Sequence, residues 1–175
     1  YSKWGGFLDD VPFDPIEFGM PPNSLSSIDP VQLLALKTAR AALEDAGYLE
    51  RSFDRRRTSV VLGASGGTGD LGAAYVLRST LPLILGDQAS ELISRVDGGL
   101  PEWTEDSFAG LLLNVAAGRI ANRFDLGGLN YIVDAACASS LTAVHLAVKE
   151  LETGGTDMVI VGGIDTVQNP FGYLC

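Results

Sequence analysis

The chain has 175 residues and a net charge of −10 at pH 7, from 12 Lys and Arg against 22 Asp and Glu. Its 46% hydrophobic and 19% charged residues are enough for the core of one domain, which excludes intrinsic disorder. A pI near 4.4 argues against a nucleic-acid partner, since such partners need a basic stripe and the only dense positive run is 55–57.

The chain has two cysteines, Cys137 and Cys175, which supply neither a disulfide scaffold nor a zinc site. We therefore expect a reducing compartment, the cytoplasm. No apolar stretch approaches the roughly 18 residues of a membrane span, so we expect a soluble chain without a membrane partner. The sequence has no initiator Met and its last residues carry no terminal feature, so we expect a fragment of a longer protein.

In chain order, the first thirty residues hold five prolines and predict an irregular surface segment. Asp29 and Pro30 then form a strong helix start, and Gly47 is the expected stop of a mostly buried helix. Short β-branched or apolar runs predict three buried strands, at 58–62, 131–133 and 158–161. Helical segments between them are expected at 69–80, 107–122 and 139–151, so the pattern favours a parallel α/β sheet.

Two regions are harder to assign. Residues 81–103 fit neither period and are interpreted as a loop-rich insertion over the sheet. The helix at 107–122 is apolar until Arg119, so it must be covered. It could lie in the core of the monomer or pack against the same helix of a second subunit. The sequence leaves both possibilities open.

Cys137 lies where the strand at 131–133 gives way, through small residues, to the helix at 139–151. Small residues let the chain turn sharply there, as at the serine nucleophile of other strand-to-helix corners. A thiol at a helix N-terminus faces the positive end of the helix dipole, which favours the thiolate, and the free N–H groups there can hold an oxyanion. The alternative is that Cys137 is a small buried apolar filler.

A cysteine nucleophile that uses a general base needs a partner within hydrogen-bond reach. The only histidine is His145, eight residues along the same helix. At 1.5 Å per residue it lies about 12 Å away along the axis. His145 is therefore expected to be a helix-face residue, and a catalytic histidine would have to come from elsewhere.

A second candidate is a glycine cluster at 63–72, which follows a predicted strand and contains a formal GxGxxG at Gly67, Gly69 and Gly72. Asp87 could stand for the ribose-binding acid of a dinucleotide fold. Pro82 weakens this hypothesis, because it falls within the required second strand. A tight loop where backbones pack closely is the favoured interpretation.

Residues 134–141, Asp-Ala-Ala-Cys-Ala-Ser-Ser-Leu, resemble the active-site segment of β-ketoacyl synthases in modular polyketide and polyunsaturated-fatty-acid synthases. Further motifs are similar to this family and occur in its order, at 4–9, 13–15, 29–34, 41–47, 114–120 and 162–165. The resemblance implies a thiolase-like layered α/β fold with buried helices and a mixed, mostly parallel sheet. Residues 1–175 would be the N-terminal half of a ketosynthase domain, without its first strand and its C-terminal half.

The resemblance also implies an enzymatic activity. We expect that this activity uses no bound cofactor, since its substrates are carried on phosphopantetheine. Cys137 would take an acyl group from the phosphopantetheine arm of an acyl-carrier protein, and its amide would supply one oxyanion donor. Malonyl-carrier protein would then be decarboxylated and the carbanion joined to the acyl carbon, inside a homodimer of a multidomain synthase. The family's catalytic histidines and lysine lie in the C-terminal half, so this fragment alone is expected to be inactive.

The resemblance also implies to which branch of the family the chain belongs and which residues line its acyl pocket. Ala135 and Ala138 replace the Thr and Ser of many polyketide enzymes, and 18–22 and 100–103 look more like the polyunsaturated-fatty-acid branch. The helix at 107–122 would lie at the dimer interface. Its portion near the acyl pocket would comprise Leu111, Leu112, Leu113, Asn114 and Val115. A dinucleotide-binding domain and a non-catalytic partner subunit that keeps the ketosynthase fold are the alternative hypotheses.

Overall fold

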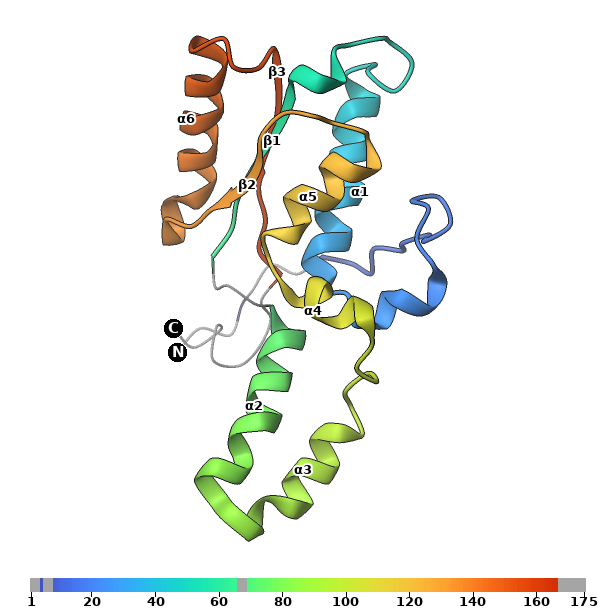
Figure 1. Ribbon diagram of the computed structural model, residues 1–175, viewed down its shortest axis with the longest axis vertical. Coiled ribbons are helices and arrows are strands. Elements are labelled where there is room, and N and C mark those ends of the chain that lie inside the picture. Colours follow the sequence, from blue (N-terminus) through green and yellow to red (C-terminus); the bar gives the residue numbers. More distant parts are fainter. Residues whose placement is uncertain (1–3, 5–7, 66–68, 167–175) are drawn as a thin grey trace.

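The computed structural model describes residues 4, 8–65 and 69–166. Helices precede and follow each of the first two strands, and the four helices α2 to α5 lie between β1 and β2 (Figure 1). The elements are α1 (Pro30–Asp45), β1 (Thr58–Gly63), α2 (Asp70–Leu85), α3 (Ser90–Asp97), α4 (Glu105–Leu111), α5 (Val115–Arg123), β2 (Asn130–Val133), α6 (Ser139–Glu152) and β3 (Met158–Gly163). Short 3-10 turns lie at Pro22–Ser27, Arg55–Arg57, Gly86–Ala89 and Ala136–Ala138.

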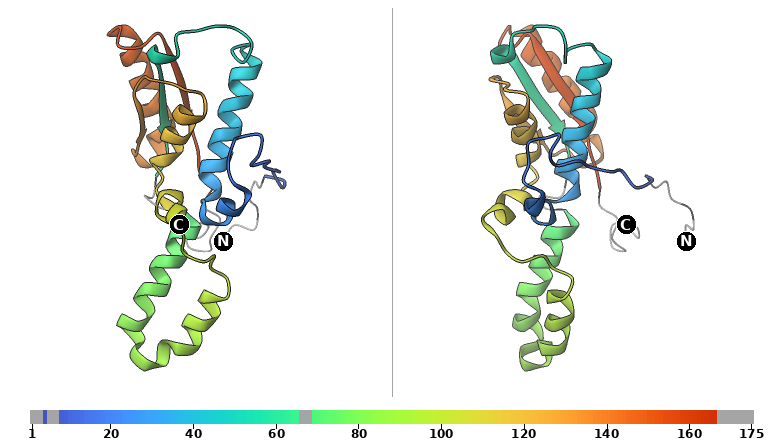
Figure 2. Two further views of the ribbon diagram at one scale, coloured as in Figure 1. Left: turned by 45° about the vertical axis from the view of Figure 1, so that its right-hand side comes forward. Right: turned by 90° about the vertical axis from the view of Figure 1, so that its right-hand side faces the viewer.

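The sheet has the strand order β2-β1-β3, and both strand pairs are parallel. Val60 of β1 lies opposite Asn130 on one side and Ile160 on the other. The positions of all three predicted strands are confirmed, but only β1 is buried, since β2 and β3 consist of partly buried and exposed residues. The mixed sheet is not seen, because every strand pair in the described ranges is parallel. Helices α1 and α5 lie on one side of the sheet and α6 on the other (Figure 2), so β1 is buried along its whole length.

The core lies between the sheet, α1 and α5. Leu36, Val60 and Ile120 are almost fully buried there, together with the small residues Ala116 and Ala117 of α5. Burial of these side chains supplies the main favourable term for folding. Helix α5 therefore packs in the core of the monomer, which is one of the two arrangements that its sequence allows.

The prediction that the first thirty residues lie on the surface is wrong for their second half. Phe18, Met20 and Ile28 are buried in the core. The backbone N–H groups of Phe18 and Met20 both donate to the carbonyl oxygen of Pro15, and Phe13 stacks on Phe18 with ring centroids 4.7 Å apart. The prolines shape turns that aim these isolated apolar side chains inward, and such turns carry no periodic signal.

Helix α1 begins as predicted. Asp29 is its N-cap and accepts a hydrogen bond from the Val31 N–H at 3.1 Å, and Pro30 occupies the first turn. After the helix Gly47 has a φ of +73°, a backbone conformation that glycine adopts readily. The start and the stop that the sequence indicates are both confirmed.

The interpretation of 81–103 as a loop-rich insertion over the sheet is wrong. Helix α2 continues through Pro82 to Leu85, a turn follows, and α3 returns beside α2 (Figure 1). The two helices form an arm that points away from the sheet. Arg78 pairs with Asp97 at 2.7 Å inside this arm. Only Gly72 of the two helices is buried. Helix α2 has apolar residues around most of its circumference and therefore a weak helical period, whereas α3 has a clear period but spans only the eight residues Ser90–Asp97.

The single helix expected over 107–122 is two helices, α4 and α5. Leu112 has φ −79° and ψ 119°, an extended conformation that ends α4. The backbone of α4 also packs closely on the 3-10 turn Pro22–Ser27, since a Cβ on Gly110 would collide with the Ser27 carbonyl oxygen. The break is imposed by packing against other elements and not by a local breaker residue.

Candidate active site

Cys137 lies at the carboxyl edge of the sheet, in the 3-10 turn between β2 and α6. Its thiol is free and its residue is exposed. The alternative interpretation as a buried apolar filler is therefore wrong for this chain. Because parallel strands end at one edge, the ends of β1 and β3 lie at this same edge.

Two side chains fix the turn around Cys137. Asp134 Oδ1 accepts from the Ala136 N–H at 2.9 Å, and Ser139 Oγ accepts from the Ala135 N–H at 2.9 Å. The same Ser139 hydroxyl donates to the Ala136 carbonyl oxygen at 2.6 Å. Ala136 is held at a φ of +49°, which is uncommon for a residue with a side chain and recurs at functional turns. Asp134 and Ser139 brace the turn, a role that is not predicted above, although Asp and Ser are typical of such turns.

Two glycines let the start of α6 sit directly on the sheet. Gly63 of β1 and Gly163 of β3 are opposite each other in the register. A Cβ on Gly63 would collide with the backbone of Ser139, and a Cβ on Gly163 would collide with the Ser140 side chain. The absent side chains therefore allow the first turn of α6 to rest against both strand ends, just after Cys137.

The segment from Leu111 to Val115 spans the break between α4 and α5. Leu111 and Leu113 are buried, Leu112 and Val115 are partly buried and Asn114 is exposed. Leu113 packs with Val31 and Ala64, and Ile132 of β2 packs against the same cluster. The segment therefore approaches the strand that leads to Cys137.

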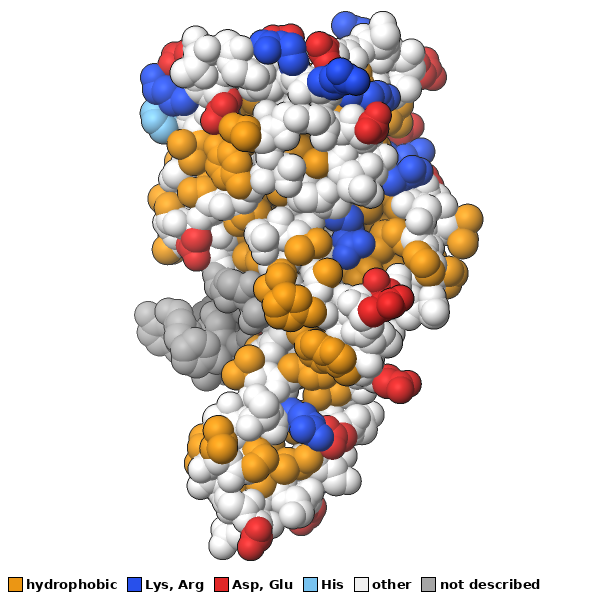
Figure 3. Space-filling model, in the orientation of Figure 1, with side chains coloured by type: hydrophobic (Ala, Val, Ile, Leu, Met, Phe, Trp, Pro, Cys, Tyr) orange, Lys and Arg blue, Asp and Glu red, His pale blue; other side chains and the backbone are white. Residues whose placement is uncertain are grey.

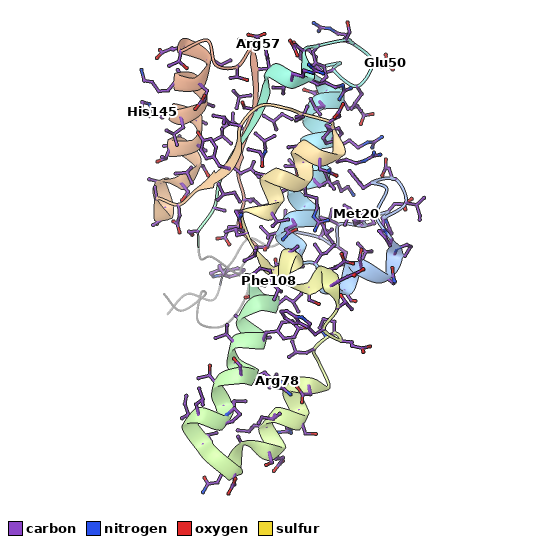
Figure 4. The ribbon with its side chains drawn as sticks, in the orientation of Figure 1. Met20, Glu50, Arg57, Arg78, Phe108 and His145 are labelled. Carbon is purple, nitrogen blue, oxygen red and sulfur yellow. The ribbon has the colours of Figure 1, made fainter. Side chains whose placement is uncertain are left out.

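His145 is exposed on α6 and projects from the outer side of that helix (Figure 4). This position is that of a helix-face residue, as its place in the sequence predicts. Among residues 4, 8–65 and 69–166, no group of three or more His, Cys, Asp or Glu side chains could hold a metal ion. No helix in these ranges is long and apolar enough to cross a membrane.

The dinucleotide hypothesis finds no support in the structure. Gly67 lies outside the described residues. Where that fold requires a second strand, the chain forms α2 and α3, and Asp87 falls in the turn between them. Gly69 has another role: it is the N-cap of α2, and a Cβ there would collide with the buried carboxylate of Asp29. The close-packed loop, which was the favoured interpretation, is what the structure has at Gly69.

An exposed thiol on a braced strand-to-helix turn, at the carboxyl edge of a parallel sheet, is an arrangement suited to a covalent nucleophile. The comparisons with known proteins agree. The sequence profile described as "Beta-ketoacyl synthase, N-terminal domain" matches residues 1–175. The chain therefore belongs to the β-ketoacyl synthase family.

Individual relatives within this family are polyunsaturated fatty acid synthases and polyketide synthases. A polyunsaturated fatty acid synthase protein of Thraustochytrium sp. (strain ATCC 26185 / S-3) is 37% identical over 95% of this chain, which covers 6% of that protein. Polyketide synthase PksN of Bacillus subtilis (strain 168) is 34% identical over 98% of this chain, which covers 3% of that protein. The chain thus spans a small part of these relatives.

Solved structures agree on the fold. The oxazolomycin ketosynthase domain OzmH KS7 of Streptomyces albus JA3453 is 30% identical, with a TM-score of 0.68 over 99% of this chain and 27% of that one. A β-ketoacyl synthase of Burkholderia phymatum STM815 is 22% identical, with a TM-score of 0.64 over 97% of this chain and 36% of that one. The predicted thiolase-like layered α/β fold is confirmed.

Proposed function

We propose that this chain is the nucleophile-bearing part of a β-ketoacyl synthase that condenses acyl groups held on acyl-carrier protein. The Cys137 thiolate attacks the carbonyl carbon of an acyl-phosphopantetheine thioester, the pantetheine thiol leaves, and the acyl group becomes a thioester of Cys137. Malonyl-carrier protein then loses CO₂, and its carbanion attacks that thioester. The product is a β-ketoacyl-carrier protein with two more carbons, and the Cys137 thiol is released.

The observation that carries this proposal is the exposed Cys137 thiol on a turn fixed by Asp134 and Ser139. Preorganisation of this kind reduces the entropy lost on reaching a reactive geometry. The N-terminus of α6, which begins at Ser139, lies beside the thiol. The Cys137 amide is suited to supply one hydrogen bond to the oxyanion of a tetrahedral intermediate, whereas the Ala138 and Ser139 N–H groups donate to the carbonyl oxygens of Ala135 and Ala136.

We also propose that 1–175 is part of a larger ketosynthase domain, whose remainder covers an apolar face of α6. Leu141, Val144, Val148 and Leu151 recur at helical spacing and are 78%, 45%, 45% and 44% exposed. Figure 3 shows hydrophobic side chains on the surface over this helix. An exposed apolar patch of this kind marks an interaction surface. The catalytic histidines and lysine would come from the covering half.

Further parts of the proposal concern the site and the assembly. Leu111, Leu112, Leu113, Asn114 and Val115 would line the acyl pocket and approach a second subunit of a homodimer. The support is that the segment packs with Ile132, five residues before Cys137. Carrier protein and other synthase domains would be partners in the cytoplasm. The 37% identity to a polyunsaturated fatty acid synthase protein favours that branch.

The test is product formation by the full-length protein. With an acyl-carrier protein and malonyl-carrier protein, we expect a β-ketoacyl product that is extended by a two-carbon unit. The Cys137→Ala variant should form none, whereas Cys175→Ala, which removes the other cysteine of residues 1–175, should keep the activity. Condensation at an unchanged rate by Cys137→Ala would overturn the proposal. Absence of product from the wild-type protein would favour the non-catalytic partner subunit.

A further inference from the structure

Gln32 of α1 is fully buried, and both ends of its amide are used. Its Nε2 group donates to the carbonyl oxygens of Ala109, Gly110 and Leu112 at 2.9, 2.8 and 2.9 Å. Its Oε1 atom accepts from Arg119 Nε at 3.0 Å. An amide has two N–H bonds, so three carbonyl oxygens share them.

These carbonyl groups belong to the break between α4 and α5. The last carbonyl groups of a helix lack partners within that helix, and burying them unpaired is unfavourable. Gln32 donates to all three oxygens from a different helix, in addition to the Asp29 N–H at the Gly110 oxygen and the Val115 N–H at the Leu112 oxygen. Because Leu112 is extended where α4 ends, the Gln32 amide bonds to the point where the backbone changes direction.

Arg119 links this amide to α5. It is partly buried, and burial lowers its pKa, while the nearby carboxylate of Asp106 in α4 acts in the opposite direction. Gln32 therefore connects α1, the break and α5 through one side chain. The break has few ways to shift while these hydrogen bonds persist, since its neighbours Ala116 and Ala117 are packed without exposure.

We propose that Gln32 is a positioning residue that fixes the wall of the acyl site and thereby sets selectivity for acyl chain length. This inference rests on the proposed function. Leu111 and Leu113 flank the residue whose carbonyl oxygen Gln32 binds, and Leu113 packs in the cluster that Ile132 joins. A displacement of the break would move these two side chains relative to the acyl group and leave the Cys137 turn in place.

The test uses Gln32→Glu in the full-length protein, with Gln88→Glu on an exposed turn as the matched control. Loading of Cys137 is measured with a two-carbon and an eight-carbon acyl pantetheine thioester. An ionised carboxylate at position 32 faces three carbonyl oxygens and loses the donors, although Arg119 still pairs with it. We expect the ratio of eight-carbon to two-carbon loading to change by about tenfold, with alkylation of Cys137 by iodoacetamide unchanged.

A pH profile separates positioning from general destabilisation. Burial and the carbonyl oxygens raise the pKa of the introduced carboxyl, while Arg119 lowers it and the carboxylate of Asp106 raises it. Below that pKa the carboxyl is protonated and donates again, so the ratio should return toward the wild-type value as the pH is lowered through that pKa. The ratio for Gln88→Glu should stay at the wild-type value throughout.

Each outcome decides the inference. An unchanged ratio in a Gln32→Glu protein that still loads Cys137 would overturn it and leave the proposed function intact. A wild-type protein that fails to load Cys137 would overturn both. If Gln32→Glu does not fold, Arg119→Lys replaces it, because Lys keeps the charge and loosens the bond to Oε1. We then expect a change of the ratio in the same direction, by about threefold, and an unchanged ratio overturns the inference.

Discussion

Asp29 is the residue whose replacement should destabilise the fold most clearly. Its side chain is 1% exposed and serves two helices. Oδ1 accepts from the Val31 N–H of α1 at 3.1 Å, and Oδ2 accepts from the Leu71 N–H of α2 at 3.4 Å. One carboxylate therefore ties the arm of α2 and α3 to the helix that covers the sheet, beside the positive ends of two helix dipoles.

The magnitude follows from these contacts. Loss of an N-cap costs about 1 kcal/mol, and a buried donor left unpaired costs about 1–3 kcal/mol. With two N-termini affected, and the Leu71 bond being long, we expect Asp29→Ala to lower the free energy of unfolding by about 3 kcal/mol. Asp29→Asn keeps one carbonyl oxygen as an acceptor and should lose about 1 kcal/mol.

Urea unfolding of the full-length protein measures these losses as shifts of the midpoint at constant slope. The matched control is Asp54→Ala, because Asp54 is exposed and accepts from the Arg56 N–H at 3.0 Å in a short 3-10 turn. We expect that variant to lose about 0.5 kcal/mol or less. If Asp29→Ala were no more destabilising than Asp54→Ala, the account of a shared cap would be refuted.

Three further predictions concern other backbone and charge contacts. Gly69→Ala should lower the free energy of unfolding by about 1–3 kcal/mol, because the added Cβ collides with the Asp29 carboxylate. The loss should be smaller in an Asp29→Ala background, and additive losses in a double-mutant cycle would contradict this. Ala136→Val should be about 1–2 kcal/mol less stable than Ala136→Gly in thermal unfolding, because a β-branched residue resists a φ of +49°, and equal stabilities would count against it. Hydrogen bonds from Arg57 lower the pKa of Asp157 from 3.8. Their contribution to stability is therefore present above pH 3.8 and is lost as the pH falls through the lowered pKa. Arg57→Gln should make the free energy of unfolding less dependent on pH in this acid range, and an unchanged dependence would exclude this role.

The strands and the first helix could be predicted because their signals are local. The β-branched run that begins at Thr58 and the pair Asp29 and Pro30 each specify their own conformation. The break at Leu112 could not, because its contacts are long-range: the Leu112 carbonyl oxygen accepts from Gln32, which is 80 residues away in the chain. Phe18 and Met20 were missed for a similar reason, since isolated apolar residues between prolines show no period.

In the candidate site, too, the locally encoded features could be predicted from the sequence and the long-range contacts could not. Small residues around Cys137 predict the turn, and the structure places the thiol at an exposed corner. Gly63 and Gly163 make that corner possible, although they are 100 residues apart, and only the strand register brings them together. Gln32 looks like an ordinary polar residue of a helix in the sequence, and its burial depends on the carbonyl groups that face it.

The most direct measurement is site-resolved mass spectrometry of the full-length protein after incubation with an acyl-carrier protein substrate. The account predicts that the peptide containing Cys137 gains the mass of the acyl group, and that hydroxylamine, which cleaves thioesters, removes it. A peptide that stays unmodified while another residue carries the acyl group would contradict the assignment of Cys137 as the nucleophile.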